Sequence, residues 1–191
     1  MTNDPWKGTG PLHDFTFVTP TFRNGEIVAL FASTCHVVDI GGRGMTPDSR
    51  QIYEEGLFIP LMHFARAGKV EQAIIDIVGA NVREAVQVVG DLHSLATCNE
   101  IACRRLVEMM DEFGITDLDR LGAHILAKSK AATLEAIGNL KPGSYKHAMR
   151  IDGYEEPVDL VATMTIGETG IDVDFTGTSG ISSYGINVPI C

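Results

Sequence analysis

Two apolar segments near the N-terminus are separated by the dipeptide Asn24-Gly25. Residues 15–19 are β-branched or aromatic, which is typical of a strand. Residues 26–38 include the run 27–32, which is apolar without alternation, and a strand of this kind is expected to be covered on both faces. Because Asn-Gly favours a two-residue type I′ turn, the two segments are predicted to form a β-hairpin.

The middle of the chain has apolar residues at three- and four-residue steps, as amphipathic helices do. This spacing predicts a helical stretch over 70–113, interrupted at Gly90, with Asp91 as the N-cap of its second part. It also predicts a helix over about 117–140, which ends before Pro142. The residues expected on the inner face of this last helix are Leu121, Ile125, Leu126, Ala132, Leu134 and Ile137.

Strand-like segments follow at 144–151, 158–166 and 171–175. Apolar residues alternate in the last two segments, so these strands are expected to have one exposed face. The order of a β-hairpin, a helical segment and an antiparallel β-meander predicts the α+β class. The parts of the chain are then a hairpin and glycine-rich loop at 1–69, a helical part at 70–140 and a meander at 141–191.

The formal net charge of −10 argues against nucleic acid and against anionic membranes as partners. No apolar run approaches the roughly 18 residues that a membrane span needs, and the first residues lack the pattern of a secretory signal. Residues 1–14 are predicted to form an ordered loop, since Trp6 and Leu12 need burial. The cysteines form no CxxC pair, so small buried thiols in a reducing compartment, and hence a cytoplasmic protein, are expected. They are Cys35, Cys98, Cys103 and Cys191.

The first candidate site lies at the open end of the predicted hairpin. Counting outward from the pair Arg23 and Glu26 places His13 opposite His36, with Cβ atoms about 5 Å apart. Two imidazoles at that separation can share a divalent metal, and Asp14 can add a hard oxygen ligand. Strand alternation places Asp14 on the opposite face, unless a bulge or the strand end re-aims it. The alternative is that the histidines hydrogen-bond to loop backbone.

The second candidate is the glycine-rich segment 39–44, which directly follows His36. Its backbone N–H groups can form an anion-binding nest, so Gly41, Gly42 and Arg43 are candidates for binding a substrate or a phosphate. Asp39 is a candidate member of the catalytic machinery, as the group that orients a histidine. The segment is neither a Walker A motif nor GxGxxG, and a tight turn is the alternative.

The third candidate is Asp174, which ends a predicted strand before Thr176 and Gly177. It is a candidate catalytic carboxylate, and the alternative is a turn in which the aspartate caps backbone N–H groups. No GxSxG elbow and no supported Cys-His pair is present, which argues against covalent hydrolase chemistry. The remaining histidines, expected to be packed or surface residues, are His63, His93, His124 and His147.

Several segments together resemble the hydantoinase B/oxoprolinase family in their order and approximate spacing. The resemblance extends over the whole chain and is specific as a set, although no single segment is. The segments are Asn3-Asp4-Pro5-Trp6, Gly10, 14–20, 35–42, 52–57, Ile59-Pro60, Asn81-Val82-Arg83, Gly90-Asp91-Leu92, 174–179, Asn187 and Pro189.

This resemblance implies that the chain covers roughly the first third to half of a longer protein, without its N-terminal start. The family includes N-methylhydantoinase B subunits, one half of ATP-dependent 5-oxoprolinases, and the similar subunits of acetone and acetophenone carboxylases. The resemblance therefore implies part of a catalytic subunit for ATP-dependent hydrolysis of a cyclic amide of hydantoin or 5-oxoproline type. It implies a hetero-oligomer in which an A-type ATPase subunit uses the ATP. The alternatives are a subunit of an acetone- or acetophenone-type carboxylase, and a non-catalytic scaffold for the A-type subunit.

The resemblance also implies a metal site. In metal-containing relatives the ligands come from a His-x-x-Asp segment and a later histidine, which fall on Asp14 and His36 in this sequence. The first histidine of that pattern falls on Pro11, which has no donor side chain, and His13 can substitute for it. A divalent metal such as Zn, Mn or Fe at these three residues is one implication, and a metal-free site is the alternative. A second departure is Leu95, where a glutamine is common in the family.

Overall fold

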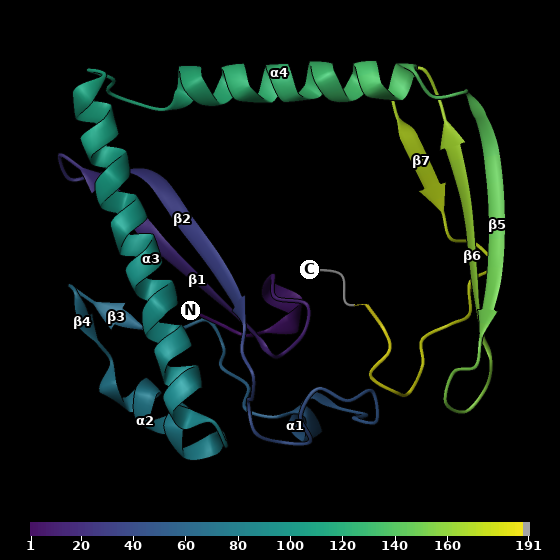
Figure 1. Ribbon diagram of the computed structural model, residues 1–191, viewed down its shortest axis with the longest axis horizontal. Coiled ribbons are helices and arrows are strands. Elements are labelled where there is room, and N and C mark those ends of the chain that lie inside the picture. The colour runs from purple at the N-terminus through teal and green to yellow at the C-terminus, as the bar shows by residue number, and fades with distance from the viewer. Residues whose placement is uncertain (189–191) are drawn as a thin grey trace. The chain divides into compact units, whose positions relative to one another are not determined.

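The computed structural model describes residues 1–188 and divides into two compact units (Figure 1). The first unit comprises Met1–Thr116 and Ser182–Cys191, and the second comprises Asp117–Ile181. A β-hairpin, helices and a three-stranded antiparallel sheet confirm the α+β class. The division at residue 117 lies inside the part of the chain predicted as helical.

The first unit is built on a long hairpin and a long helix. Its elements in chain order are η1 (Pro5–Lys7), β1 (Asp14–Arg23), β2 (Glu26–His36), α1 (Ile52–Glu55), β3 (Ala65–Arg66), β4 (Lys69–Val70), α2 (Gln72–Asn81) and α3 (Ala85–Glu112).

The turn of the hairpin forms at Asn24-Gly25 as predicted, with φ angles of 53° and 87°. The register changes close to this turn, because Phe22 pairs with Ile27 whereas Thr21 pairs with Ala29. One residue of β2, Val28, is therefore left without a cross-strand partner, which is the arrangement of a β-bulge.

The bulge moves every later pair by one position. Asp14 faces His36 across the ladder, and the backbone N–H of Val37 donates to the carbonyl of His13 over 2.9 Å. The prediction that His13 directly faces His36 is therefore wrong, because it assumed a ladder without a bulge.

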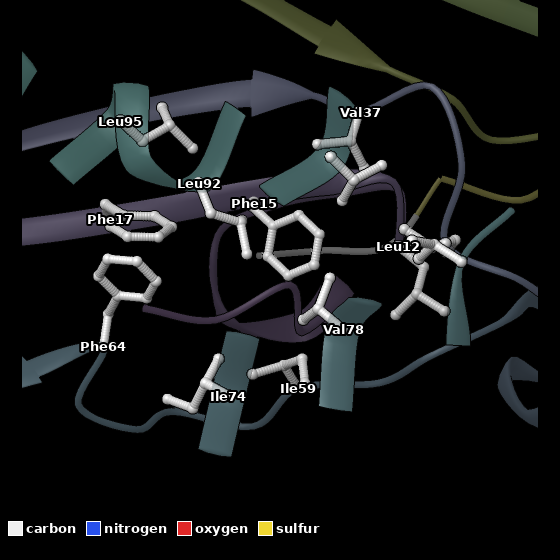
Figure 2. Packing of buried hydrophobic residues seen from close by; sticks show 13 residues of the cluster. Leu12, Phe15, Phe17, Val37, Ile59, Phe64, Ile74, Val78, Leu92 and Leu95 are labelled. Atoms are coloured by element: carbon white, nitrogen blue, oxygen red, sulfur yellow. The ribbon is translucent and has the colours of Figure 1, made fainter. Parts of the chain in front are cut away.

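The long helix α3 packs on one face of the hairpin (Figure 1). Phe15 and Phe17 of β1 point into this interface and pack near Leu92 and Leu95 of α3, as Figure 2 shows. The opposite face carries exposed apolar side chains, among them Leu30, which is 63% exposed. The prediction that β2 is covered on both faces is thus wrong for the described residues, since α3 covers one face only.

A cluster of buried apolar side chains holds the first unit together (Figure 2). Phe17 and Phe64 meet edge to face with ring centroids 4.8 Å apart, a favoured geometry for aromatic pairs. Leu12 is buried as predicted, but Trp6 is 59% exposed and its predicted burial is wrong. The cluster consists of Leu12, Phe15, Phe17, Val37, Ile40, Ile59, Phe64, Ile74, Val78, Val82, Val88, Leu92 and Leu95.

The buried amide of Asn3 ties the segment before β1 to the segment after α1. Its Nδ2 donates to the carbonyls of Leu12 and Leu57 over 2.8 and 2.9 Å, and its Oδ1 accepts from the backbone N–H of Ile59 over 2.6 Å. Asn3 has no exposed surface, so each of these groups would be unsatisfied without it.

The break between the two helices lies at residues 82–84 and not at Gly90-Asp91. The predicted N-cap at Asp91 is wrong, because α3 continues through it. The chain leaves the helix earlier, where the backbone N–H of Arg83 donates to the carboxylate of Asp39. A tertiary hydrogen bond thus overrides the weak break expected from one glycine.

The second unit contains one helix and a meander, α4 (Asp119–Gly138), β5 (Gly143–Ile151), β6 (Val158–Ile166) and β7 (Ile171–Asp174). The three strands pair antiparallel in the predicted order. No residue of α4 is buried, and Val173 is 50% exposed. The prediction of a buried inner face on α4 is therefore wrong for the described residues, which include Leu121, Ile125, Leu126, Ala132, Leu134 and Ile137. The predicted covered face is also wrong for β7, whose residues are all exposed, whereas β6 has the half-buried Val158 and Val161 and the buried Ile166.

The cysteines depart from their expected burial. Cys98 is exposed, whereas Cys35 and Cys103 are half-buried, and Cys191 lies outside the described residues. Across residues 1–188, no helix combines the length and the apolar character that crossing a bilayer demands.

The Asn3 contacts generate a stability prediction. We expect Asn3→Ala to lower the free energy of unfolding by about 2–4 kcal/mol, because it leaves two carbonyls and one N–H buried without partners. The exposed Asn81, whose Nδ2 donates only to the Ile77 carbonyl of its own helix, provides the matched control. Asn81→Ala should change stability by less than about 0.5 kcal/mol in chemical denaturation. Equal losses for the two variants would contradict the assigned role of Asn3.

Candidate functional site

The face of the hairpin turned away from α3 carries a carboxylate–imidazole pair at its open end. The Nδ1 of His36 lies 2.6 Å from the Oδ1 of Asp14. The side chain of His36 is 49% exposed and that of Asp14 is 20% exposed. An ionised carboxylate only accepts hydrogen bonds, so Nδ1 carries the proton and Nε2 keeps its lone pair. The pair therefore presents a basic nitrogen at the surface of the first unit.

The ring of His13 packs against the ring of His36. The two rings stack with centroids 5.4 Å apart and an interplanar angle of 16°, and His13 is only 4% exposed. Burial lowers the pKa of His13, and the neighbouring His36 lowers it further, although Asp39 and Asp14 act in the opposite direction. His13 is therefore neutral at physiological pH, and its uncharged ring packs against the ring of His36.

The structure brings together the three residues predicted as metal ligands, but not in the arrangement of a metal site. Among residues 1–188, no group of three or more His, Cys, Asp or Glu side chains is placed to hold a metal ion. The lone pairs of an imidazole lie in the ring plane, so the nearly parallel rings of His13 and His36 do not aim their nitrogens at one point. Asp14 and His36 are instead hydrogen-bonded to each other. The metal stays a prediction of the sequence.

Asp39 is the buried partner of an ion pair with Arg83, whose side chain is 61% exposed. Asp39 itself is 5% exposed, and its carboxylate accepts from the backbone N–H of Gly41 over 3.2 Å and from both the backbone N–H and the guanidinium of Arg83. The hydrogen bonds from Arg83 lower the pKa of Asp39 to about 2. The carboxylate of Asp39 is thus hydrogen-bonded to Gly41 and Arg83, and it acts on His13 through its charge. Its predicted role as the group that orients a histidine stays a prediction.

The glycine-rich loop is packed against other backbone. A Cβ added at Gly42 would lie 2.6 Å from the carbonyl oxygen of Glu55, and one at Gly41 would overlap the carbonyl oxygen of Asn81. The N–H of Gly41 donates to Asp39, and that of Arg43 donates to the carbonyl of Glu54 over 3.0 Å. These two N–H groups are therefore engaged within the chain. Binding of a substrate by Gly41, Gly42 and Arg43 stays a prediction.

Asp174 lies in the second unit. It forms a turn in which its carboxylate caps a backbone N–H group, as the alternative interpretation predicted. Its Oδ1 accepts from the backbone N–H and the hydroxyl of Thr176 over 2.9 and 2.6 Å. These hydrogen bonds lower the pKa of Asp174. The carboxylate thus stabilises the chain reversal after β7, and its catalytic role stays a prediction.

Two features of the site were missed from the sequence. The first is Arg83, the partner of Asp39, which lay inside the predicted helical stretch, so no local signal marked its role. The second feature is a pair of hydroxyls, Thr16 and Thr34, whose Oγ1 atoms lie 2.8 Å apart on the same face as Asp14 and His36. Counting with the bulge included would have placed this pair next to the histidine.

The sequence and fold are similar to those of known proteins. The family described as hydantoinase B/oxoprolinase matches residues 1–191. The chain is 28% identical over 204 residues to the putative B-type D-/L-hydantoinase subunit of Pseudomonas sp. (strain NS671). That alignment covers 100% of this chain and 34% of the relative, so the chain spans about a third of the relative's length.

Two solved structures share the fold. The ATP-dependent caprolactamase from Pseudomonas jessenii is similar with a TM-score of 0.77 and 25% sequence identity, over 90% of this chain and 31% of that chain. Nucleotide-free acetone carboxylase is similar with a TM-score of 0.82 and 17% identity, over 98% of this chain and 27% of that chain. At 17% identity the second similarity shows the fold alone.

The Asp39–Arg83 pair generates a prediction on acid stability. The pKa of Asp39 is about 2 in the folded state, against an ordinary value of 3.8. Its stabilising contribution is therefore complete above about pH 4 and is lost as the pH falls towards 2. We expect Asp39→Asn to lower the free energy of unfolding by about 2 kcal/mol at pH 7, and the gap to the unsubstituted protein to narrow by pH 3.

Denaturant titrations at pH 7 and pH 3 measure the difference in the free energy of unfolding between Asp39→Asn and the unsubstituted protein. The exposed Asp48 provides a matched control, and Asp48→Asn should leave stability within about 0.5 kcal/mol at both. An equal loss of stability for Asp39→Asn at pH 7 and at pH 3 would show that the ionised carboxylate is not the source of the stabilisation.

Proposed function

The chain belongs to the hydantoinase B/oxoprolinase family, and on that premise we propose that it forms part of an enzyme for ATP-dependent hydrolysis of a cyclic amide of hydantoin or 5-oxoproline type. The similarity to a B-type hydantoinase subunit and to an ATP-dependent caprolactamase supports this reaction class. The proposal includes an A-type ATPase partner that uses the ATP to activate the ring carbonyl. The proposed setting is a cytoplasmic hetero-oligomer that takes a small-molecule substrate.

The observation that carries the proposal is the hydrogen bond between Asp14 and His36. Asp14 holds the proton on Nδ1, so Nε2 is the nitrogen that accepts a proton, and the exposure of the ring makes it accessible. In the proposed step Nε2 takes a proton from the water that adds to the ring carbonyl carbon. The C–N bond then breaks, and the same proton passes from Nε2 to the leaving nitrogen. The phosphoryl group that ATP placed on the carbonyl oxygen leaves as inorganic phosphate when a second water hydrolyses the resulting acyl phosphate.

Asp14 and His13 have positioning roles in this step. The carboxylate fixes the tautomer of His36 and stabilises the imidazolium that forms after proton uptake. The neutral ring of His13 prevents the imidazole from turning away and adds no positive charge that would disfavour protonation of His36. The three residues therefore suit general acid–base chemistry on one face of the hairpin.

A divalent metal, Zn, Mn or Fe, bound by His13, Asp14 and His36 is the competing proposal from the sequence. It requires the hydrogen bond between Asp14 and His36 to open and the ring of His13 to turn, because the rings are stacked nearly parallel. The proposed acid–base step does not pass through a metal. Elemental analysis of the purified protein distinguishes the two proposals, since a stoichiometric divalent ion that is lost in His36→Ala would favour the metal.

The proposed function predicts a kinetic effect at His36. We expect His36→Ala to lower kcat for ring opening by about 10²–10⁴-fold, the usual contribution of a general acid–base group. Asp14→Asn should also lower kcat, because an amide no longer fixes the proton on Nδ1 and part of the His36 rings then carry it on Nε2. The assay is the formation of ring-opened product by the full-length protein with its ATPase partner and ATP.

The control for this prediction is His63→Ala. His63 is exposed in the same unit and takes no part in the proposed step, so turnover should be unchanged. Full turnover after combined substitution of Asp14 and His36 would refute the catalytic role and favour the scaffold alternative. Incorporation of labelled bicarbonate into the product would instead favour the carboxylase.

A further inference from the structure

The hairpin face that carries Asp14 and His36 continues with a second polar pair. Thr16 and Thr34 are directly paired across the ladder, and their hydroxyl oxygens lie 2.8 Å apart. Residues two positions apart on a strand lie on the same face, so this pair stands about 7 Å along the hairpin from Asp14 and His36. The two polar pairs therefore form one continuous strip.

Beyond the threonines the same face becomes apolar. The next pairs along the ladder are Val18 with Ala32 and Pro20 with Leu30. Val18 is 52% exposed and Leu30 is 63% exposed, so this part of the face is open in the first unit. The order along the face is thus a base, a hydroxyl pair and an apolar surface.

The hydroxyl pair has unused hydrogen-bonding capacity. One hydroxyl donates to the other, and either atom can be the donor. The second hydroxyl keeps its proton free, and both oxygens keep lone pairs. The pair therefore offers one donor and one acceptor on neighbouring atoms, and the roles of the two oxygens can be exchanged.

This capacity is complementary to a cyclic amide. A small ring holds its secondary amide in the cis form, with the N–H and the C=O at the same edge of the ring. An open-chain secondary amide is trans, and its N–H and C=O point in opposite directions. Two hydroxyls 2.8 Å apart can contact both groups of a cis amide at once, but only one group of a trans amide.

We propose that Thr16 and Thr34 form the subsite that binds the cis amide of the substrate, next to the base on His36, and that Val18 and Ala32 contact the apolar part of its ring. The inference rests on the proposed function, and it names the substrate class as small cyclic secondary amides with an aliphatic ring portion. It also gives a reason why the enzyme would discriminate against linear amides.

A structural explanation of the threonines competes with this proposal. Cross-strand threonine pairs stabilise a sheet by roughly 0.2–1 kcal/mol whether or not a ligand binds. The two explanations differ in what a substitution changes. A structural pair affects stability alone, whereas a subsite affects KM and the choice between cyclic and linear amides.

The test compares Thr34→Val, Thr16→Val and the double variant in the full-length protein with its ATPase partner, with hydantoin, 5-oxoproline and caprolactam as probes. For whichever probe the unsubstituted enzyme opens, the double variant should raise KM by about 10–100-fold, and kcat should change less. Thr34→Ser keeps the hydroxyl and should retain a KM close to that of the unsubstituted enzyme. The matched control is Thr19→Val on the face that packs against α3, which should leave KM unchanged.

A binding measurement separates this inference from the proposed function. His36→Ala should still bind the probe in calorimetry although it does not turn it over, and addition of Thr16→Val and Thr34→Val to that variant should abolish binding. Unchanged KM and unchanged binding in the double threonine variant, with turnover still lost in His36→Ala, would overturn the subsite alone. Full turnover in His36→Ala would overturn the proposed function instead.

Discussion

The bulge at Val28 decides which side chains share the outer face of the hairpin. Side chains of a strand alternate between faces, so a shift of one position moves every residue of β1 relative to its partners in β2. With the bulge, Asp14 meets His36 and Thr16 meets Thr34. Without it, Asp14 would pair with Cys35, and His36 would lie on the opposite face of the hairpin from Asp14.

The hairpin is kept in place by polar contacts as well as by apolar packing. Asn3 ties the entry to β1 to the segment after α1, and Asp39 ties the exit from β2 to Arg83 between α2 and α3. Both side chains are buried, so their hydrogen bonds are strongly required. Asn3 donates to the carbonyl of Leu12, and Val37 donates to the carbonyl of His13, so the interactions that close the first unit also fix the backbone that carries His13.

The patterns in the sequence were sufficient for the element types and the α+β class, because apolar periodicity and turn residues are local signals. The turn at Asn24-Gly25 and the antiparallel meander follow from such signals. The register was not predictable by counting, because counting from the turn assumes a regular ladder and no local signal marked the extra residue at Val28. The break at residues 82–84 was missed for a similar reason, since it is set by the distant carboxylate of Asp39. The candidate residues His13, Asp14 and His36 do come together, through a hydrogen bond between Asp14 and His36 and the stacked rings of the two histidines, and their binding of a metal stays a prediction.

The proposed mechanism depends on Asp14 holding the proton on Nδ1 of His36, which leaves Nε2 as a base. The most direct test is nitrogen-15 NMR of the histidine rings in the purified protein at a pH where His36 is neutral. The Nδ1-protonated tautomer is expected for His36, together with a change in the tautomer mixture in Asp14→Asn. An Nε2-protonated ring, or a ring nitrogen shifted by a bound metal, would contradict the proposed mechanism.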